Sequence, residues 1–272
     1  MLFGRSLYFT LIIFSVLFTA GCAYKSSTNK TAVGIERKQF MMLSSSQMDQ
    51  SSKQAYSRVV TEAKKKQLFN KDSKTVKRLK GILNNLIPHT AVFRNDAVNW
   101  KWEVNLLKSK ELNAWCMPGG KMMFYSGLVE KLNLNDAQIA AIMGHEMGHA
   151  LREHSREKVS RSLAAQLTLS IATSALGLQI DISSIANEIL DVTFNLPNSR
   201  EAEREADRIG VELAARAGYD PKEAVKIWQK MAKLPHANKP EILSTHPVYE
   251  NRIKDLQKYA DLVEPLYINA KK

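Results

Sequence analysis

Cysteine is nearly absent from this chain of 272 residues. Only Cys22 and Cys116 occur, so a disulfide scaffold is excluded and folding must depend on a hydrophobic core. With 44% apolar residues, the chain is large enough to bury one. Nothing in the composition indicates disorder or a collagen-like repeat.

The sequence also lacks a hydrophobic run long enough to span a bilayer. The most apolar segment, from Leu7 to Phe18, follows the single charge of Arg5. It is too short for a transmembrane helix and has the layout of a secretory signal peptide. We therefore predict that residues 1–21 form a signal peptide.

The apolar run ends in Thr19-Ala20-Gly21-Cys22. Small residues directly before a cysteine resemble the bacterial lipobox, in which the cysteine is acylated and becomes the mature N-terminus. This resemblance implies lipidation of Cys22, a polar tether over residues 22–33 and a folded domain over residues 34–272. It also implies a membrane partner, reached through the lipid anchor.

Acidic residues are scarce relative to basic ones: 27 against 39, for a formal net charge of +12. Nucleic acid or an anionic membrane surface would explain such an excess. The basic residues are scattered, however, with no aromatic-interleaved stripe and no finger or helix-turn-helix signature. We predict no nucleic-acid partner and a solvated basic surface.

Hydrophobic periodicity predicts an α+β fold that is mostly helical. Helices are expected over residues 46–68 and 74–86. Alternating apolar residues from Trp102 to Leu106, and two apolar segments separated by Pro118-Gly119-Gly120, predict a small antiparallel sheet. Residues 162–177 are too polar to span a membrane and are expected to form a buried or lid-forming helix, which leaves membrane contact open.

A metal-binding pattern lies on the next predicted helix, which starts at the cap Asn135-Asp136 and is expected to run to about Lys158. His145 and His149 are four residues apart, so their side chains lie about 40° apart around the helix axis and can reach one ion. Neutral imidazoles suit zinc, which needs a third protein ligand and a water in a catalytic site. Glu146 lies between them in projection and can take a proton from that water.

The third ligand is not another histidine of this helix. The metzincin pattern requires a histidine six positions after His149, and Ser155 stands there. His154 projects about 140° from His149 around a continuous helix. We therefore expect His154 to face away from the metal, at the surface.

Carboxylates of a later helix are the remaining candidates. The helix that begins near Ser199 carries an apolar stripe that includes Ala206 and Ile209. In projection Glu203 is the acid nearest this stripe, and Glu201 and Glu205 project away from it. Asp207 is one turn further on and is expected to receive a hydrogen bond from a ligand histidine.

Several motifs, in this order, resemble the HtpX-like zinc metallopeptidases, which are gluzincins related to the CAAX prenyl endopeptidases, and in particular their secreted lipoprotein branch. The motifs are Gly34-Ile35-Glu36-Arg37-Lys38-Gln39-Phe40, Asn113-Ala114-Trp115-Cys116-Met117-Pro118-Gly119-Gly120, Gly144-His145-Glu146-Met147-Gly148-His149-Ala150, the segment from Glu203 to Asp207, and Ser244-Thr245-His246-Pro247. They extend over nearly the whole mature chain.

The resemblance implies a fold, a site and an activity. The fold is a gluzincin-type metallopeptidase domain, and the cofactor is one Zn²⁺ per chain. The implied zinc ligands are His145, His149 and Glu203, with Glu146 as general base and Asp207 as supporting acid. The implied edge strand, to which a substrate would add, consists of Lys121, Met122, Met123, Phe124 and Tyr125.

The resemblance also implies a location and a substrate class. Ala23 is not the Asp that commonly retains bacterial lipoproteins in the inner membrane, so an outer-membrane lipoprotein facing the periplasm is expected. The expected substrates are unfolded or misassembled envelope proteins, in particular outer-membrane proteins. A proteolytically quiet periplasmic chaperone or assembly factor is the alternative function.

His246 is a further candidate ligand. It precedes Pro247, so its backbone is biased to an extended conformation and its imidazole is presented from a loop. Three roles stay open for it: a fourth zinc ligand that keeps the enzyme latent, a group that stabilises the oxyanion, or a histidine that packs or caps at a helix start.

Overall fold

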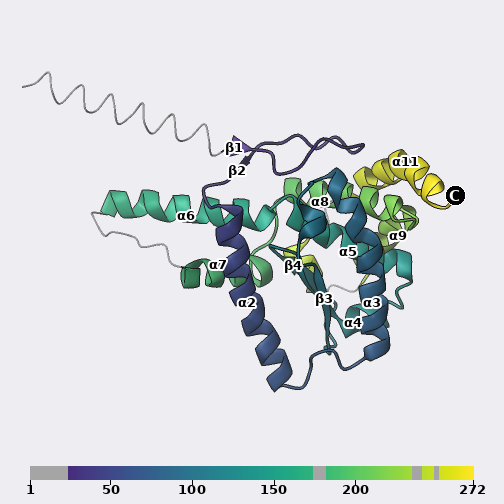
Figure 1. Cartoon of the computed structure of the whole chain (residues 1–272), viewed down its shortest axis with the longest axis horizontal. Coiled ribbons are helices and arrows are strands. Elements are labelled where there is room, and N and C mark those ends of the chain that lie inside the picture. Colours follow the sequence, from purple (N-terminus) through teal and green to yellow (C-terminus); the bar gives the residue numbers. More distant parts are fainter. Residues whose placement is uncertain (1–23, 174–181, 235–240, 248–250) are drawn as a thin grey trace, which may run out of the picture.

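The computed structural model describes residues 24–173, 182–234, 241–247 and 251–272 (Figure 1). The predicted signal peptide and Cys22 lie outside these ranges, as do residues 174–177 of the predicted 162–177 helix. The described part is mostly helical with small sheets, which confirms the predicted class. None of its helices combines the length and the apolar character that crossing a membrane requires.

The α-helices of the described residues are, in chain order, α2 (Ser45–Lys65), α3 (Ser73–Leu86), α4 (Ser126–Lys131), α5 (Asp136–Leu151), α6 (His154–Thr173), α7 (Ile182–Phe194), α8 (Arg200–Arg216), α9 (Lys222–Ala232), α10 (Ile242–Thr245) and α11 (Arg252–Ala270). Two 3₁₀ segments, η1 (Ile87–Val92) and η2 (Ala97–Asn99), connect α3 to the sheet.

The main sheet has three strands, β3 (Glu103–Leu107), β4 (Ala114–Met117) and β5 (Lys121–Tyr125). β4 and β5 form the expected antiparallel hairpin, whose turn places Gly119 and Gly120 at φ values of 75° and 79°. Only glycine adopts these values without strain. β3 pairs parallel to β5, so the sheet is mixed and the expectation of a fully antiparallel sheet was wrong.

The strand order β3-β5-β4 also overturns the predicted edge strand. Lys121–Tyr125 is the central strand, because the chain crosses from β3 to the far side of the sheet before β5 returns between the two. Its backbone groups are therefore engaged on both sides and offer no free edge to another chain. Among the described strands, β4 is the edge nearest to α5.

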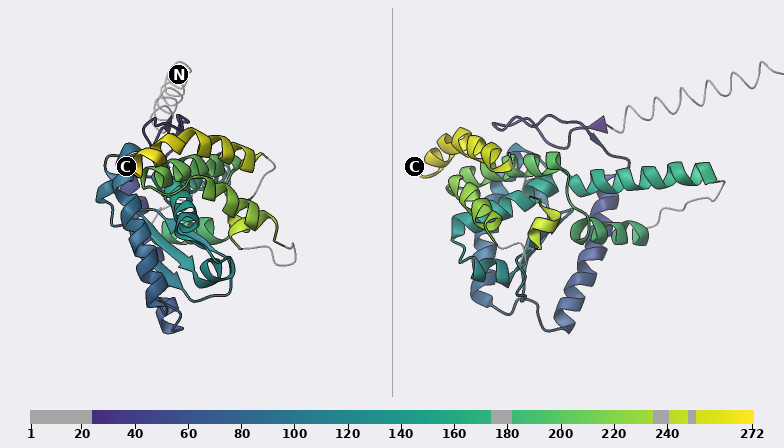
Figure 2. Two further views of the ribbon diagram at one scale, coloured as in Figure 1. Left: turned by 90° about the vertical axis from the view of Figure 1, so that its right-hand side faces the viewer. Right: turned by 180° about the vertical axis from the view of Figure 1, so that it is seen from behind.

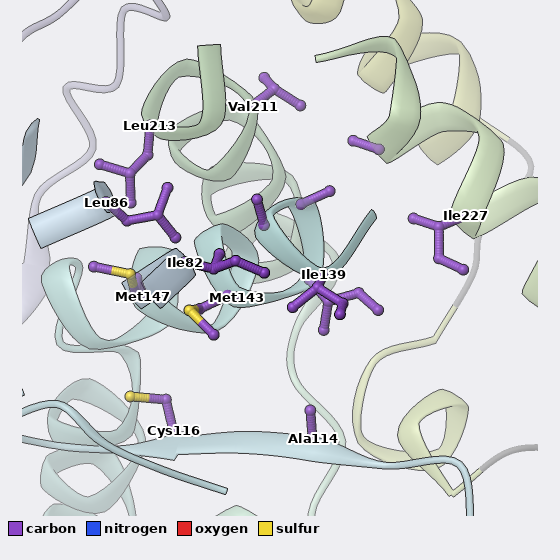
Figure 3. Close-up of a cluster of buried hydrophobic side chains, with 14 of the residues drawn as sticks. Ile82, Leu86, Ala114, Cys116, Ile139, Met143, Met147, Val211, Leu213 and Ile227 are labelled. Atoms are coloured by element: carbon purple, nitrogen blue, oxygen red, sulfur yellow. The ribbon is translucent and has the colours of Figure 1, made fainter. Parts of the chain in front are cut away.

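Helix α5 lies in the centre of the molecule, between the sheet and α8, and α11 covers the outer side of α8 (Figures 1 and 2). Figure 3 shows Met143 and Met147 pointing from α5 toward the apolar layer formed with Cys116 of β4 and Ile82 of α3. Every residue of α5 from Ile139 onward is buried. A helix buried on all sides holds its side chains in fixed positions.

Helices α5 and α8 approach each other to backbone contact. A Cβ added at Gly144 would lie 2.9 Å from the carbonyl oxygen of Gly210, and one at Gly148 would lie 2.8 Å from that of Ala206. These distances are shorter than real Cβ contacts, so the packing requires glycine at both α5 positions. The close approach brings the polar residues of the two helices together.

Helix α5 ends earlier than predicted. Its last residue is Leu151, Glu153 takes a left-handed φ of 51°, and α6 begins at His154. The predicted single helix to Lys158 is therefore two helices with a break between them.

An N-terminal arm, residues 24–44, runs over α6, α8 and the α5–α6 break (Figure 1). Its strands β1 (Tyr24–Lys25) and β2 (Gln39–Phe40) pair antiparallel. Gln39 donates to the carbonyl of Arg152 at 2.7 Å, and Thr31 donates to Glu212 of α8 at 2.7 Å. The arm is therefore fixed to the domain by buried hydrogen bonds.

Candidate metal centre

The two histidines of α5 meet at their Nε2 atoms. A capping box formed by Asn135 and Gln138 starts the helix, and both imidazoles project from its buried C-terminal half. The Nε2 atoms of His145 and His149 are 3.2 Å apart. Burial lowers the pKa of His149 well below its usual range although Glu203 acts to raise it. The imidazole of His149 is therefore neutral, the form that binds metals.

Glu203 reaches the same point from α8. Ser199 caps this helix, and the Glu203 side chain is fully buried, in contrast to the exposed Glu201. Its Oε1 lies 3.3 Å from Nε2 of His149, and its Oε2 lies 3.5 Å from Nε2 of His145. The backbone contact between α5 and α8 makes these short separations possible.

His246 supplies a fourth group. It follows the short helix α10 with φ −120° and ψ 75°, so its ring comes from a loop. Its Nδ1 lies 2.9 Å from Oε1 of Glu203 and 3.1 Å from Nε2 of His145. The structure thus brings His246 to the other three residues, and the ligand atoms of all four lie within 4.8 Å of one another.

The spacing of these atoms fits a zinc ion. Ligand atoms in a tetrahedron about 2.05 Å from zinc are about 3.3 Å apart. Five of the six pairs among these residues have atoms 2.9 to 3.5 Å apart, with Oε1 of Glu203 facing His149 and His246 and Oε2 facing His145. Three imidazoles and a carboxylate also make a nitrogen and oxygen donor set that suits zinc. The residues therefore fit the predicted cofactor.

Glu146 lies beside this cluster without being one of its four members. It is buried, its Oε1 has no hydrogen-bond partner among the described residues, and that atom lies 3.5 Å from Nε2 of His246. Burial raises the pKa of Glu146, although His246 and His145 oppose the shift. A buried carboxylate with one oxygen free of hydrogen bonds next to a metal site is suited to accept a proton.

His145 is oriented by a carboxylate. Its Nδ1 donates to Oδ1 of Asp207 at 2.9 Å, and Asp207 in turn accepts from Nε and Nη2 of Arg252 at 2.7 and 2.9 Å. Burial would raise the pKa of Asp207, but Arg252 and His145 outweigh it and lower that pKa. The ring of His145 therefore presents Nε2 to the cluster.

Arg252 was not foreseen from the sequence. Besides Asp207, it approaches Glu203 at 2.9 Å and stacks over Trp228 at 3.8 Å. A signal was present, because Arg252 occupies the same helical stripe as the buried Leu256 of α11. An arginine on an apolar stripe indicates a buried partner.

His149 is oriented through a second histidine. Nδ1 of His149 lies 2.8 Å from Nδ1 of His154, and Nε2 of His154 lies 3.0 Å from Oε2 of Glu205. Arg37 of the N-terminal arm and Arg152 both donate to Glu205. The expectation that His154 lies at the surface was wrong, and the side chains of His154 and Glu205 are both buried.

The physical reason is the break between α5 and α6. The projection of His154 assumed one continuous helix, and the left-handed residue Glu153 redirects the chain just before it. Glu205 does project away from the stripe that faces α5, but the arm supplies Arg37 to cover it. The polar sequence of the N-terminal arm did not indicate that Arg37 would cover Glu205.

A narrow cavity opens from the cluster toward β4. Its walls include Trp115 and Cys116 of β4, Glu146, His149 and His246, with Val192, Thr193 and Asn198 on the opposite side. The edge strand and the metal cluster therefore border one space.

Comparison with known proteins identifies the family. A model described as peptidase family M48 matches residues 73–260. The mitochondrial metalloendopeptidase OMA1 of Arabidopsis thaliana is 34% identical over 183 residues, which cover 66% of this chain and 36% of that protein. OMA1 of Saccharomyces cerevisiae is 31% identical over 175 residues, covering 61% and 49%. The beta-barrel assembly-enhancing protease of Escherichia coli is 29% identical over 177 residues, covering 61% and 36%.

The chain thus spans between about a third and a half of the length of these relatives. The matched range contains the whole four-residue cluster and Glu146. The predictions of a metalloprotease and of zinc are confirmed at the level of the family, and the lipoprotein branch stays a prediction. The chain belongs to peptidase family M48.

Proposed function

We propose that this protein is a zinc-dependent endopeptidase that cleaves unfolded or misassembled proteins of the bacterial envelope. The observation that carries the proposal is Glu146, buried beside a zinc-like donor set and lacking a hydrogen bond to one of its carboxylate oxygens. In a purely structural zinc site, such a carboxylate would only add an unpaired buried group.

Each residue of the site has a separate role in the proposed reaction. His145, His149 and Glu203 would hold the zinc ion, which when bound polarises a peptide carbonyl and lowers the pKa of a water. Glu146 takes the proton of the attacking water and gives it to the leaving amine. Asp207 keeps His145 in the orientation that the site requires.

We propose that His246 makes the resting enzyme latent. Its Nδ1 lies 2.9 Å from Oε1 of Glu203 and 3.1 Å from Nε2 of His145. A zinc site closed by four protein ligands has no position for the attacking water. Opening would require His246 to leave the cluster, and His246 lies on a loop rather than within a helix.

An extended substrate would add to β4, in place of the strand first expected. β4 is the edge of the described sheet, and Trp115 and Cys116 line the same cavity as Glu146. Strand addition gives affinity through main-chain hydrogen bonds and needs an unfolded segment of substrate. That requirement favours unfolded proteins over folded ones.

Location and substrate class follow from the N-terminus and from one relative. The segment before Cys22 predicts export and acylation, and Ala23 predicts an outer-membrane lipoprotein facing the periplasm. The relative from Escherichia coli is named for enhancing β-barrel assembly, which supports outer-membrane proteins as substrates. Cys22→Ser should lose acylation and membrane association. Wild-type protein that is unmodified and soluble would contradict the location.

The test of the activity is cleavage of a denatured outer-membrane protein, measured together with zinc content, for the wild type and Glu146→Gln. The isosteric glutamine cannot take a proton, so we expect unchanged zinc content and a rate lower by about 10²–10⁴-fold. Stoichiometric loss of zinc would show instead that Glu146 is a ligand.

The alternative is a proteolytically quiet chaperone with zinc as a structural element. Under this function, Glu146→Gln would leave the protein's effect on its client unchanged, whereas a chelator would act only by destabilising the fold. Casein cleavage that is abolished by a chelator would favour the peptidase. If the zinc-loaded His246→Ala variant does not cleave casein, the chaperone is favoured.

A further inference from the structure

We propose that a second pocket beside the metal centre is a substrate subsite, and that it takes an aromatic side chain two to three residues before the scissile bond. This proposal rests on the proposed peptidase function. The pocket lies between the N-terminal end of α2, the segment after η2, the β4–β5 turn and the α5–α6 break, and its volume is about 380 Å³. Pockets of this size hold small ligands or single large side chains.

The pocket adjoins the catalytic cavity. His149 and Ser155 line both spaces, so the two meet at the α5–α6 break. A substrate held at the metal centre is therefore adjacent to the pocket. No residue predicted from the sequence to bind substrate lines the pocket except Lys121.

The direction of β4 places the pocket relative to the scissile bond. Trp115 and Cys116 border the catalytic cavity, and Pro118 and Gly119, just beyond the end of β4, border the pocket. A substrate that adds antiparallel to β4, the more stable pairing, has its N-terminal part at this end. Two residues of strand span about 7 Å, so the pocket faces the second or third residue before the bond.

Six of the eight charged groups of the wall are paired with one another. Asp49 bonds to Lys53 at 2.7 Å, Arg94 to Asp96 at 2.9 Å, and Arg156 to Glu153 at 2.8 Å. The other two, Lys101 and Lys121, are basic, and Lys121 approaches Glu103 outside the pocket at 3.4 Å. The wall therefore disfavours a basic side chain. Its uncharged surface comes from Met48, Trp100, Pro118, Gly119 and Ala150, together with His149 and small polar residues.

Trp100 makes the pocket specific for aromatic groups. Its ring stacks on Trp102 with centroids 5.3 Å apart, and the Arg94 guanidinium lies 4.9 Å from it. These contacts fix the indole before any ligand arrives. An aromatic ring gains about 0.5–1.5 kcal/mol from packing on another beyond the area that it buries.

The opposite wall is equally rigid. Ser52 of α2 donates to the carbonyl of Pro118 at 2.8 Å, and a Cβ at Gly119 would lie only 2.1 Å from Oδ1 of Asp49. The turn and α2 are therefore in close contact, so the pocket keeps its shape without substrate. A preformed pocket binds without a cost of ordering.

The experiment measures both binding and cleavage of ten-residue peptides. In each peptide of the series one position carries Phe and the others near the scissile bond carry Ala. Fluorescently labelled peptides are titrated into the Glu146→Gln protein, and quenched versions are cleaved by the wild type. We expect Phe two or three positions before the bond to improve Kd and kcat/KM by about tenfold or more over Ala.

Two variants of α2 test the location of the pocket. Ser46 is exposed and lines the pocket, whereas Gln50 is exposed on the same helix and does not. Ser46→Trp should fill the pocket and reduce the Phe-to-Ala ratio to about one, and Gln50→Trp should leave the ratio unchanged. Equal ratios in both variants, or a Phe preference only after the bond, would overturn the subsite. Absence of both binding and cleavage for every peptide, in the zinc-loaded His246→Ala protein as well, would overturn the peptidase function itself.

Discussion

The Nδ1 atoms of His149 and His154 lie 2.8 Å apart, and this contact determines which nitrogen of each ring carries a proton. His149 directs Nε2 to the metal cluster, so its proton is on Nδ1 and is donated to His154. His154 must then accept at Nδ1 and carry its own proton on Nε2, which it donates to Glu205. Burial lowers the pKa of both histidines, which agrees with neutral rings.

Two substitutions at His154 separate orientation from packing. His154→Phe keeps the ring but accepts no hydrogen bond, so zinc affinity should fall by about 10–100-fold. His154→Gln can accept from His149 and donate to Glu205, so most of the affinity should return. Zinc affinity is measured by competition with a chromogenic chelator, and urea unfolding of the metal-free proteins controls for stability. An equal loss in both variants would mean that His154 only fills space.

Four of the acids of α8, Glu201, Glu203, Glu205 and Asp207, should differ in their effect on zinc affinity. Glu203→Ala removes a donor and should have the largest effect, whereas Glu201→Ala, at an exposed position, should have none. Asp207→Ala and Glu205→Ala remove the partners that orient the two histidines and should each cost about 10–100-fold. Equal affinity across all four variants, measured by the same competition, would contradict the assignment of Glu203 as a ligand.

His246→Ala should raise the rate of cleavage of an unfolded substrate while zinc stays bound. The reason is that removing the fourth donor frees a position for water. The measurement is the initial rate together with zinc content. A large fall in rate with zinc retained would assign His246 to stabilisation of the oxyanion, and an unchanged rate would leave it a packing role.

The N-terminal arm should make folding stability depend on acidic pH. Burial would raise the pKa of Glu157, but hydrogen bonds from Arg37, Gln39 and Arg161 outweigh it and lower that pKa to about 2. A carboxyl whose pKa is lower in the folded state than in the unfolded state stabilises the folded protein at pH values above its ordinary pKa of about 4.5. This contribution to stability is lost as the pH falls toward 2.

Arg37→Gln tests this dependence, with urea unfolding of the metal-free protein followed from pH 7 to pH 2.5. The variant should be less stable than the wild type at pH 7, and the difference should shrink below about pH 4.5 as Glu157 and Glu205 take up protons. Arg161→Gln is the control, because Arg161 is exposed and should contribute less. A difference that is independent of pH would show that Arg37 acts through packing.

Local patterns in the sequence sufficed to predict the start of α5, the meeting of His145 and His149 on it and the burial of Glu203, because four-residue spacing and an apolar stripe are properties of one helix. The positions of β5 and of His154 were mispredicted, because each depends on a chain reversal. Strand order follows from how β3, β5 and β4 pair, and one left-handed residue at Glu153 redirects the chain into α6. Arg37 is 168 positions from Glu205, so local periodicity could not have connected them.

The glycines between α5 and α8 have a consequence for how this site tolerates change. Gly144 and Gly148 bring the backbones of the two helices into contact. The distance between His149 and Glu203 is therefore set by this backbone contact and does not depend on the size of side chains between the helices. Substitutions elsewhere in the core can alter stability while the spacing of these two donors stays the same. Gly148→Ala, by contrast, would place a methyl group between α5 and α8, and this group would push His149 of α5 away from Glu203 of α8.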